Sequence, residues 1–397
     1  MTAVLRAEWT KFRTVRGWLI ALAVAGVAVI AFGYLVANGS QSTFCTPGGS
    51  CGIGHPFVPT GPGGEAVADT YRYVEHPLTG NGTVVARVTS LDGRVWAGPA
   101  NAAPSLRDTR PGLAGWAKAG LLVTPSTKPG SPYAAVMVTG GHGVRFQYDY
   151  TRDRRGEGGP LAAGRPRWLR LRRTGGTITG YQSGDGTTWT PVGVAHLSRL
   201  PRTVDIGLFV TSPVIFPGSS QGTATQATAT FDRVALTGDG RGGGTGGWRQ
   251  LSVGASRADF YPTLSAGRSR PSRAGLVVTG SGDIGPAIDP IAGGATISSS
   301  ILFGLVVALI VLVIVATMLM TVEYRRGLIR TTLAATPRPA RVLAAKAVVA
   351  AAAAFAVTAA AVAAAIPIAH HLLTTNGNYV FPAGLGTELQ VVLGAGA

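Results

Sequence analysis

The acidic residues are the first candidates for chemistry, because a glycoside-hydrolysing site needs two carboxylates that face each other across a cleft. The acids of the central region stand singly, in turns or in an arginine-rich segment, and include Asp149, Asp153, Glu157, Asp185 and Asp205. No E-x-D or E-x-D-x-x-E strand pattern brings two of them together. The sequence therefore predicts a chain that is not a glycoside hydrolase.

A short motif surrounds Asp185. Residues 183–189 read SGDGTTW, which is close to the Asp-box pattern S-x-D-x-G-x-T-W but one residue shorter. An Asp-Gly pair between two strands is above all a hairpin device, since Gly186 tolerates the positive φ of a tight turn. The weaker alternative is sugar contact through Trp168, Asp185 and Trp189. Two further tryptophans, Trp96 and Trp116, could also stack on sugar rings, although most such rings in a sandwich belong to the core.

Other catalytic and cofactor motifs are missing. Residues 280–284 are glycine-rich, but no GxxxxGK[ST] phosphate loop occurs, so we expect no ATP hydrolysis by this chain. None of the six histidines lies near a G-x-S-x-G sequence. The two cysteines, Cys45 and Cys51 in CTPGGSC, have no neighbouring histidines to complete a metal site. We expect no metal and no cofactor here, and a Cys45–Cys51 disulfide outside the cytoplasm, with two free thiols as the alternative.

Three long apolar runs predict a membrane part. They cover residues 18–37, 301–322 and 342–373, and the second has no charge over 22 residues. At about 1.5 Å per residue this run reaches roughly 33 Å, close to the thickness of the hydrocarbon core. The first run is too long for a typical signal peptide and lacks a clean A-x-A cleavage site, so we expect a retained anchor.

Basic residues set the expected orientation. They cluster before the first run and between the second and third runs, and none follows Lys346. Both basic segments should therefore be cytoplasmic, and residues 38–300 external. The net charge of +17 could favour anionic partners, but the plainer interpretation is solubility. An outward-facing domain makes nucleic acid an unlikely partner, and we expect none.

The external region predicts an all-β antiparallel sandwich or jelly roll over residues 65–237. Eight short alternating runs, such as TVVARVTSL, KAGLLVTP and TVDIGLFVTS, are separated by turn residues. We expect residues 38–64 to be a linker that carries the cysteine pair. Residues 238–300 are rich in glycine and serine and should be a second linker. The order of the runs, with WLRLRR at 168–173 and YQSGDGTTW at 181–189, resembles the concanavalin A-like lectin/glucanase sandwich.

The membrane part resembles the ABC-2 type transporter permeases. Residues 5–18, LRAEWTKFRTVRGW, are similar to the start of that family. Residues 323–346, which begin EYRRGLIRTTLAATPRP, are similar to its segment between the second and third spans; Leu328 and Pro339 depart from the usual pattern. The resemblance implies a multi-span α-helical subunit of a bacterial plasma-membrane ABC exporter, with the sandwich inserted between its first two spans.

This resemblance also implies roles for named residues. Residues 1–17 would form an interfacial amphipathic helix, using Trp9, Lys11, Phe12 and Arg13. Residues 323–341 would be the cytoplasmic loop that docks a separate ATP-binding subunit, which holds ATP-Mg. The residues expected to couple the two subunits are Glu323, Tyr324, Arg325, Arg326, Gly327, Arg330 and Pro337. The expected partners are that ATPase, a second permease subunit and membrane lipid, with a cell-surface glycan as a further candidate.

Two expectations stay open at this stage. Residues 374–397 should form an external loop and the start of a fourth span, which predicts a C-terminally truncated chain. The alternative function is a membrane-anchored surface protein that binds carbohydrate, or senses, through the sandwich.

Overall fold

The computed structural model places two compact units, Pro56–Ala292 and Met1–His55 together with Gly293–Ala397. It describes residues 2–45, 51–55, 57–99, 104–159, 161, 165–198, 200–216, 222–238, 247–254, 265, 267–288, 297–325, 327, 334 and 338–397. At residues 44, 45, 51, 297–303, 319, 320 and 322–325 it describes the backbone alone. We call the first unit the sandwich and the second the helical unit.

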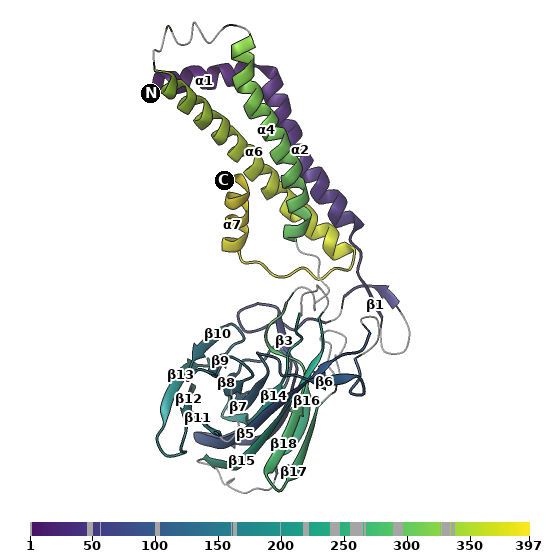
Figure 1. The fold of residues 1–397 in the computed structure, drawn as a ribbon, viewed down its shortest axis with the longest axis vertical. Coiled ribbons are helices and arrows are strands. Elements are labelled where there is room, and N and C mark those ends of the chain that lie inside the picture. Colours follow the sequence, from purple (N-terminus) through teal and green to yellow (C-terminus); the bar gives the residue numbers. More distant parts are fainter. Residues whose placement is uncertain are drawn as a thin grey trace. The chain divides into compact units, whose positions relative to one another are not determined.

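The sandwich consists of antiparallel sheets (Figure 1). One has seven strands in the order β10-β9-β8-β7-β14-β4-β16. Their bounds are β4 Tyr71–Thr79, β7 Lys118–Thr124, β8 Ala134–Thr139, β9 Val144–Tyr148, β10 Arg152–Arg155, β14 Thr203–Thr211 and β16 Arg249–Val253. The facing sheet has the order β13-β12-β11-β5-β15-β18-β17, with β6 paired to β5. Its strands are β5 Gly82–Trp96, β6 Thr109–Pro111, β11 Arg167–Thr174, β12 Thr177–Ser183, β13 Thr190–His196, β15 Thr225–Gly238, β17 Arg268–Ser272 and β18 Gly275–Gly280.

The main core fills the space between these two sheets. It includes Leu121 and Ile206 from the seven-stranded sheet, and Leu169, Ile178 and Phe231 from the facing sheet. All eight predicted runs are strands, so the all-β antiparallel sandwich is confirmed. Sequence alternation predicted strands such as β11 and β15 correctly because buried residues in them alternate with partly or fully exposed ones.

A second apolar cluster covers the outer face of the seven-stranded sheet. It contains Tyr73, Leu122, Met137 and Phe209, and it packs under the short pair β3 Val67–Asp69 and β19 Ile284–Pro286. Every residue of β7 and β8 is buried in consequence. A strand buried on both faces reads as a continuous apolar run, as KAGLLVT does.

The prediction that residues 238–300 form a linker is wrong. Within it lie β16, β17, β18 and β19, which pair with β4, β15 and β3 and bury Val253, Val278 and Ile284. The sandwich therefore extends well beyond residue 237. The segment 238–300 is rich in glycine and serine, which predicts a linker. Its strands are stabilised by partner strands far back in the sequence, and local composition does not show these.

The helical unit contains α1 Thr2–Thr14, α2 Arg16–Gly39, α4 Ile297–Arg325, α6 Pro339–Thr375 and α7 Leu385–Gly396 (Figure 1). Helix α2 packs against both α4 and α6. Gly304 lets α4 approach closely, since a Cβ there would lie 2.7 Å from the carbonyl oxygen of Val29. The far ends of α2 and α6 are joined by hydrogen bonds from the Asn378 side-chain amide to Ser40 O, at 2.9 Å, and from Asn376 to Ala37 O, at 3.1 Å.

The predicted apolar segments are thus helices, and Pro339 stands in the first turn of α6, where a proline is tolerated. By length and composition α2 and α6 are able to cross a bilayer. In α4 the apolar part with described side chains is Gly304–Met318, which is shorter. Residues 374–397 form a loop and the twelve-residue α7. A multi-span topology remains a prediction.

Candidate functional site

The clearest candidate site of the sandwich is a groove of about 330 Å³ on the outer side of the seven-stranded sheet. We call it the Trp116 groove. It collects residues from distant parts of the sequence: from the loop before β7 and β7 itself, from the end of β9, from the segment after β14, and from β19. The lining residues that bear on its chemistry are Trp116, Lys118, Gln147, Tyr150, Asp283 and Ile288.

An ion pair fixes one wall of the groove. Lys118 extends from β7, and its Nζ lies 2.9 Å from Oδ1 of Asp283 and 2.5 Å from the carbonyl oxygen of Ile284. The lysine side chain is only 5% exposed, whereas that of Asp283 is 22% exposed. A buried ammonium needs such partners. The pair ties β19 to the sheet and leaves the carboxylate edge of Asp283 open to the groove.

Trp116 supplies an aromatic surface. Its ring is stacked on His142, with 3.9 Å between ring centroids, and the Arg145 guanidinium lies 5.3 Å from its centroid. Arg145 is itself held by Asp153 at 2.8 Å. Trp116 remains 38% exposed. It is therefore an oriented ring that still offers surface to a ligand.

Tyr150 and a buried acid form the floor beside this wall. Asp69 of β3 is buried, and its Oδ2 is 2.9 Å from both Gly130 N and the Tyr150 hydroxyl. Burial raises the pKa of Asp69 to about 7, against the lowering effect of these two hydrogen bonds. Asp149 and Tyr150 have φ values of 45° and 60°, a strained left-handed pair that turns the chain after β9.

These groups define what the groove can do. The exposed indole can pack against an apolar ring face, while the Gln147 amide and the Lys118–Asp283 pair can exchange hydrogen bonds with hydroxyl groups. Asp283 is the single carboxylate among the described lining residues. No group of three His, Cys, Asp or Glu side chains suited to a metal ion occurs in the described part of the chain. The lining groups could together contact a ligand that has both an apolar ring face and hydroxyl groups.

The sugar contacts predicted from the Asp-box motif lie elsewhere, on the facing sheet. The Trp168 ring packs against Gly186, where a Cβ would lie 2.7 Å from it, and Arg87 is 5.5 Å from its centroid. The Trp189 ring carries the Arg170 guanidinium at 4.4 Å. Like Trp116, both rings have intramolecular partners, but both are less exposed than Trp116 and offer less surface to a ligand.

Asp185 itself organises the β12–β13 loop. Its carboxylate accepts hydrogen bonds from the backbone N–H groups of Thr187 and Thr188, both at 2.8 Å, and from the Ser183 hydroxyl. These bonds hold the pKa of Asp185 well below its ordinary value. Gly186 has φ +78°, so the predicted hairpin with a positive-φ glycine is confirmed, although its loop spans residues 184–189 rather than a tight turn.

The predicted interfacial residues lie on α1. Phe12 is buried against Leu22 and Val349, whereas Trp9 is 46% exposed and Lys11 and Arg13 are exposed. Sequence reasoning missed an ion pair in this region: Glu8 of α1 lies 2.6 Å from Nζ of Lys346 on α6, and both side chains are buried. The signals were a single acid in a basic segment and a single lysine in an alanine-rich one.

The predicted ATPase-coupling residues lie largely outside the described residues. This applies to Arg326, Arg330 and Pro337. The backbone of α4 includes Glu323, Tyr324 and Arg325, whose side chains are not described. Gly327 follows the end of α4 with φ +68°.

The cysteines face each other across a small hairpin. Strand β1, Thr43–Cys45, pairs with β2, Cys51–Ile53, and the register places Cys45 opposite Cys51. Directly opposed residues have Cα atoms roughly 4.5–5.5 Å apart, within the range a disulfide requires. The disulfide itself remains a prediction.

Comparison with known proteins identifies no family for this chain. No family model matches the chain, and no curated protein matches it. Three solved structures that are similar over the sandwich are the carbohydrate-binding module CBM66 from Bacillus subtilis, lectin I-B4 from Griffonia simplicifolia and scytalido-glutamic peptidase. Their sequence identities are 14%, 10% and 11%, with TM-scores of 0.23, 0.24 and 0.32. The alignments cover 50%, 50% and 54% of this chain and 91%, 92% and 98% of those proteins.

Proposed function

We propose that the chain is a membrane-anchored protein whose sandwich binds carbohydrate in the Trp116 groove. The observation that carries this proposal is the meeting of an exposed indole, the Gln147 amide and the Lys118–Asp283 pair in one groove. Ligand sites of this kind combine apolar surface with a few oriented polar groups. A sugar presents both an apolar ring face and a fringe of hydroxyls, which makes it the matching ligand class.

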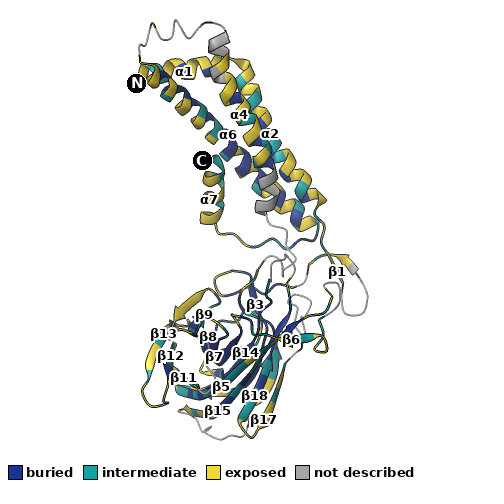
Figure 2. Cartoon of the chain, in the orientation of Figure 1, coloured by how far each residue is buried: buried dark blue, intermediate teal, exposed yellow. Residues whose placement is uncertain are grey.

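The helical unit supports the membrane anchor. Large apolar side chains are exposed on α2, α4 and α6, such as Ile20 at 63%, Leu309 at 61% and Leu343 at 58%. Helices that expose such residues on their outer sides are costly in water and favourable in hydrocarbon. The yellow outer faces of these helices in Figure 2 are therefore suited to lipid.

The test of the sugar site is binding to a panel of cell-surface polysaccharides, measured with the full chain in detergent micelles. We expect Trp116→Ala to weaken binding at least tenfold, since one ring stacking contact and its apolar contact area are lost. Trp189→Ala is the matched control, because it also removes an indole but lies on the facing sheet. Loss of binding in Trp189→Ala with full binding in Trp116→Ala would move the site to the Asp185 loop and refute the groove.

A second candidate function is the permease subunit of an ABC exporter, favoured by the Glu8–Lys346 pair. The two residues belong to the two segments that resemble ABC-2 permeases, and their 2.6 Å contact joins those segments. A simple tether has no need of a buried ion pair between α1 and α6. Residues 323–341 would then be the coupling loop of this chain, and a separate partner subunit would hydrolyse ATP.

Co-purification tests this second function. We expect an ATP-binding subunit to be retained by the full chain and lost when residues 323–330 are replaced by a glycine-serine segment of equal length. Trp116→Ala should leave that association unchanged. Absence of any ATPase from the purified wild-type chain argues against the permease and leaves the sugar-binding proposal untouched.

A further inference from the structure

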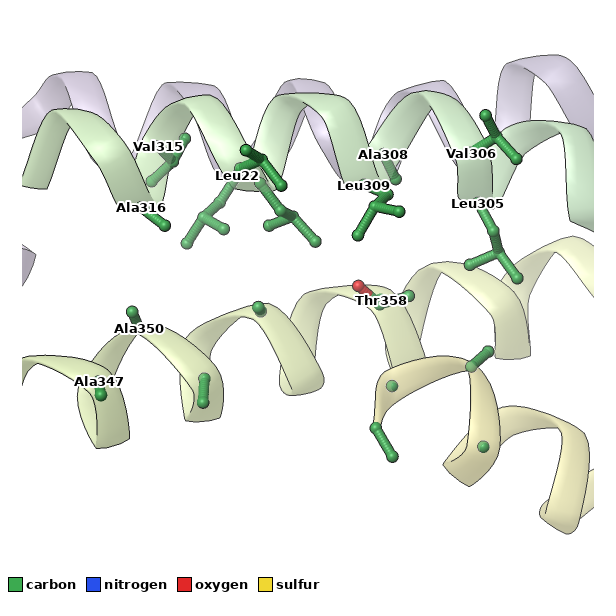
Figure 3. Close-up of a pocket in the computed structure, with 18 of the residues that line it drawn as sticks. Leu22, Leu305, Val306, Ala308, Leu309, Val315, Ala316, Ala347, Ala350 and Thr358 are labelled. Atoms are coloured by element: carbon green, nitrogen blue, oxygen red, sulfur yellow. The ribbon is translucent and has the colours of Figure 1, made fainter. Parts of the chain in front are cut away.

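An apolar cavity of about 680 Å³ lies in the helical unit, between α4 and α6. Figure 3 shows side chains of the two helices facing each other across it, among them Leu309, Ala350 and Thr358. Phe12 of α1, Leu22 of α2 and the end of α7 at residues 394–397 also line the cavity. Thr358 has the only polar side chain among the described lining residues. Water in such a cavity lacks hydrogen-bond partners, so an apolar occupant is favoured.

The cavity arises because α2 packs on both neighbouring helices while α4 and α6 make less contact with each other. It follows α4 from Leu305 to Ala316 and α6 from Ala347 to Thr358. Eleven helical steps of about 1.5 Å give roughly 17 Å, about half of the roughly 30 Å hydrocarbon core. The cavity is therefore as long as one leaflet is deep.

Cationic side chains gather near one end of the cavity. Phe12 is flanked on α1 by Lys11 and Arg13, and Arg341 stands in the first turn of α6; all three cations are exposed. The Glu8–Lys346 pair holds α1 against the start of α6, so these cations belong to the same end of the unit. An apolar cavity with cationic side chains near one end complements a molecule that has an acyl chain and an anionic headgroup.

We propose that this cavity holds one acyl chain of an anionic phospholipid whose phosphate contacts Arg13 and Arg341. The proposal rests on the membrane location proposed above. Bound in this way, the lipid fills the space between α4 and α6 and links α1 to the bundle. It is a specific ligand rather than a general solvent, because both its chain and its charge are recognised.

The full chain is reconstituted in nanodiscs with equal amounts of phosphatidylglycerol and phosphatidylcholine, then transferred to a mild detergent for native mass spectrometry. We expect one retained phosphatidylglycerol per chain, at least fivefold over phosphatidylcholine. Ala351→Trp should abolish retention because the indole occupies the cavity. Ala352→Trp is the matched control, since Ala352 is the exposed neighbour outside the lining. Arg13→Gln with Arg341→Gln should keep a lipid but lose the preference for phosphatidylglycerol.

Several outcomes would overturn the proposal. The first is equal retention of the two lipids by the wild-type chain. The second is equal loss of phosphatidylglycerol retention in both tryptophan variants. The third is a wild-type dimer that Ala351→Trp dissociates while the lipid stays bound. The last result would mean that a second copy occupies the cavity. If Ala351→Trp fails to assemble, Ala354→Leu fills less of the same cavity and should weaken retention. Alkaline carbonate extraction of the wild-type chain tests the membrane location separately.

Discussion

At the scale of single residues, burial of Asp69 raises its pKa although Tyr150 donates a hydrogen bond to it. The Tyr150 hydroxyl is 2.9 Å from both Asp69 Oδ2 and the carbonyl oxygen of Ser131, but it has only one hydrogen to donate. Tyr150 therefore divides its single hydrogen between these two acceptors, and this weak support for the Asp69 carboxylate does not offset burial, which leaves Oδ1 without a hydrogen-bond partner. The raised pKa of Asp69, about 7, agrees with this arrangement.

This raised pKa predicts how the stability of the sandwich depends on pH. The folded-state pKa of Asp69 lies near 7, above its ordinary value of 3.8, so the folded state binds the proton more tightly. The stabilisation of the folded state by this tighter proton binding is fully present below pH 4, and it is lost as the pH rises from about 4 to about 7. Asp69→Asn, which mimics the neutral acid, should raise the free energy of unfolding above pH 7, by up to about 4 kcal/mol for three pKa units. Denaturant unfolding of the full chain at pH 4, 6 and 8 measures it.

Asp185 provides the control of opposite sign. Its folded-state pKa is lowered, so its contribution is present above its ordinary pKa and is lost on acidification. Asp185→Asn should therefore destabilise the chain at pH 8 and have a smaller effect at pH 3. If Asp69→Asn were instead destabilising at pH 8, the ionised form of Asp69 would have to be the native one.

At the scale of elements, sequence patterning predicted the strands that alternate between buried and exposed residues. It failed for strands whose formation depends on tertiary contacts. The run at residues 203–211 was recognised from its β-branched and apolar residues. Strand β4 was missed because YRYVEHPLT contains charges and a proline, although it lies between β14 and β16 in the sheet. Strands β16 to β19 were missed because their stability comes from partners far back in the sequence, not from local composition.

The candidate site was predictable only in part, for a related reason. Trp116 was one of four tryptophans considered for sugar stacking, and no local signal distinguished it from Trp168 or Trp189. The distinction comes from the tertiary fold: β7 and β9 flank β8 in one sheet, and residues from β7, β9 and β19 line the same groove. In the sequence, Lys118 is simply the first residue of an apolar strand. Its ion-pair partner, Asp283, is distant in the sequence and is identified only by the structure.

The contact between α1 and α6 makes a prediction at the same scale. Removing one member of a buried ion pair leaves an uncompensated charge, whereas replacing both can be almost neutral. Lys346→Met leaves the buried Glu8 with the more exposed Lys11, at 3.1 Å, as its remaining ion-pair partner. We therefore expect this variant to destabilise the detergent-solubilised chain by up to about 3 kcal/mol and Glu8→Gln with Lys346→Met to recover most of that loss. Thermal unfolding followed by helical circular dichroism measures both. Purely additive losses in the double variant would show that the pair is not coupled.

At the scale of the whole molecule, the two units differ in what they expose. The sandwich buries its aromatic and aliphatic residues in two clusters, whereas the helices expose large apolar side chains along much of their length. One chain thus contains a unit suited to water and a unit suited to lipid. If the helical unit lies in a bilayer, as proposed, the basic residues of α1 and of the segment before α6 predict that both segments are cytoplasmic.

That distribution predicts the side on which each unit is labelled in intact bacterial cells. With Cys45 and Cys51 replaced by serine, a cysteine at the exposed Thr188 of the sandwich should react with a membrane-impermeant maleimide, whereas one at the exposed Thr10 of α1 should react only after the cells are permeabilised. The reason is that cytoplasmic loops retain lysine and arginine, while a long intervening domain crosses regardless of its charge. Labelling of Thr10→Cys from outside, with Thr188→Cys protected, would invert the topology and would place the sugar-binding groove where no surface glycan reaches it.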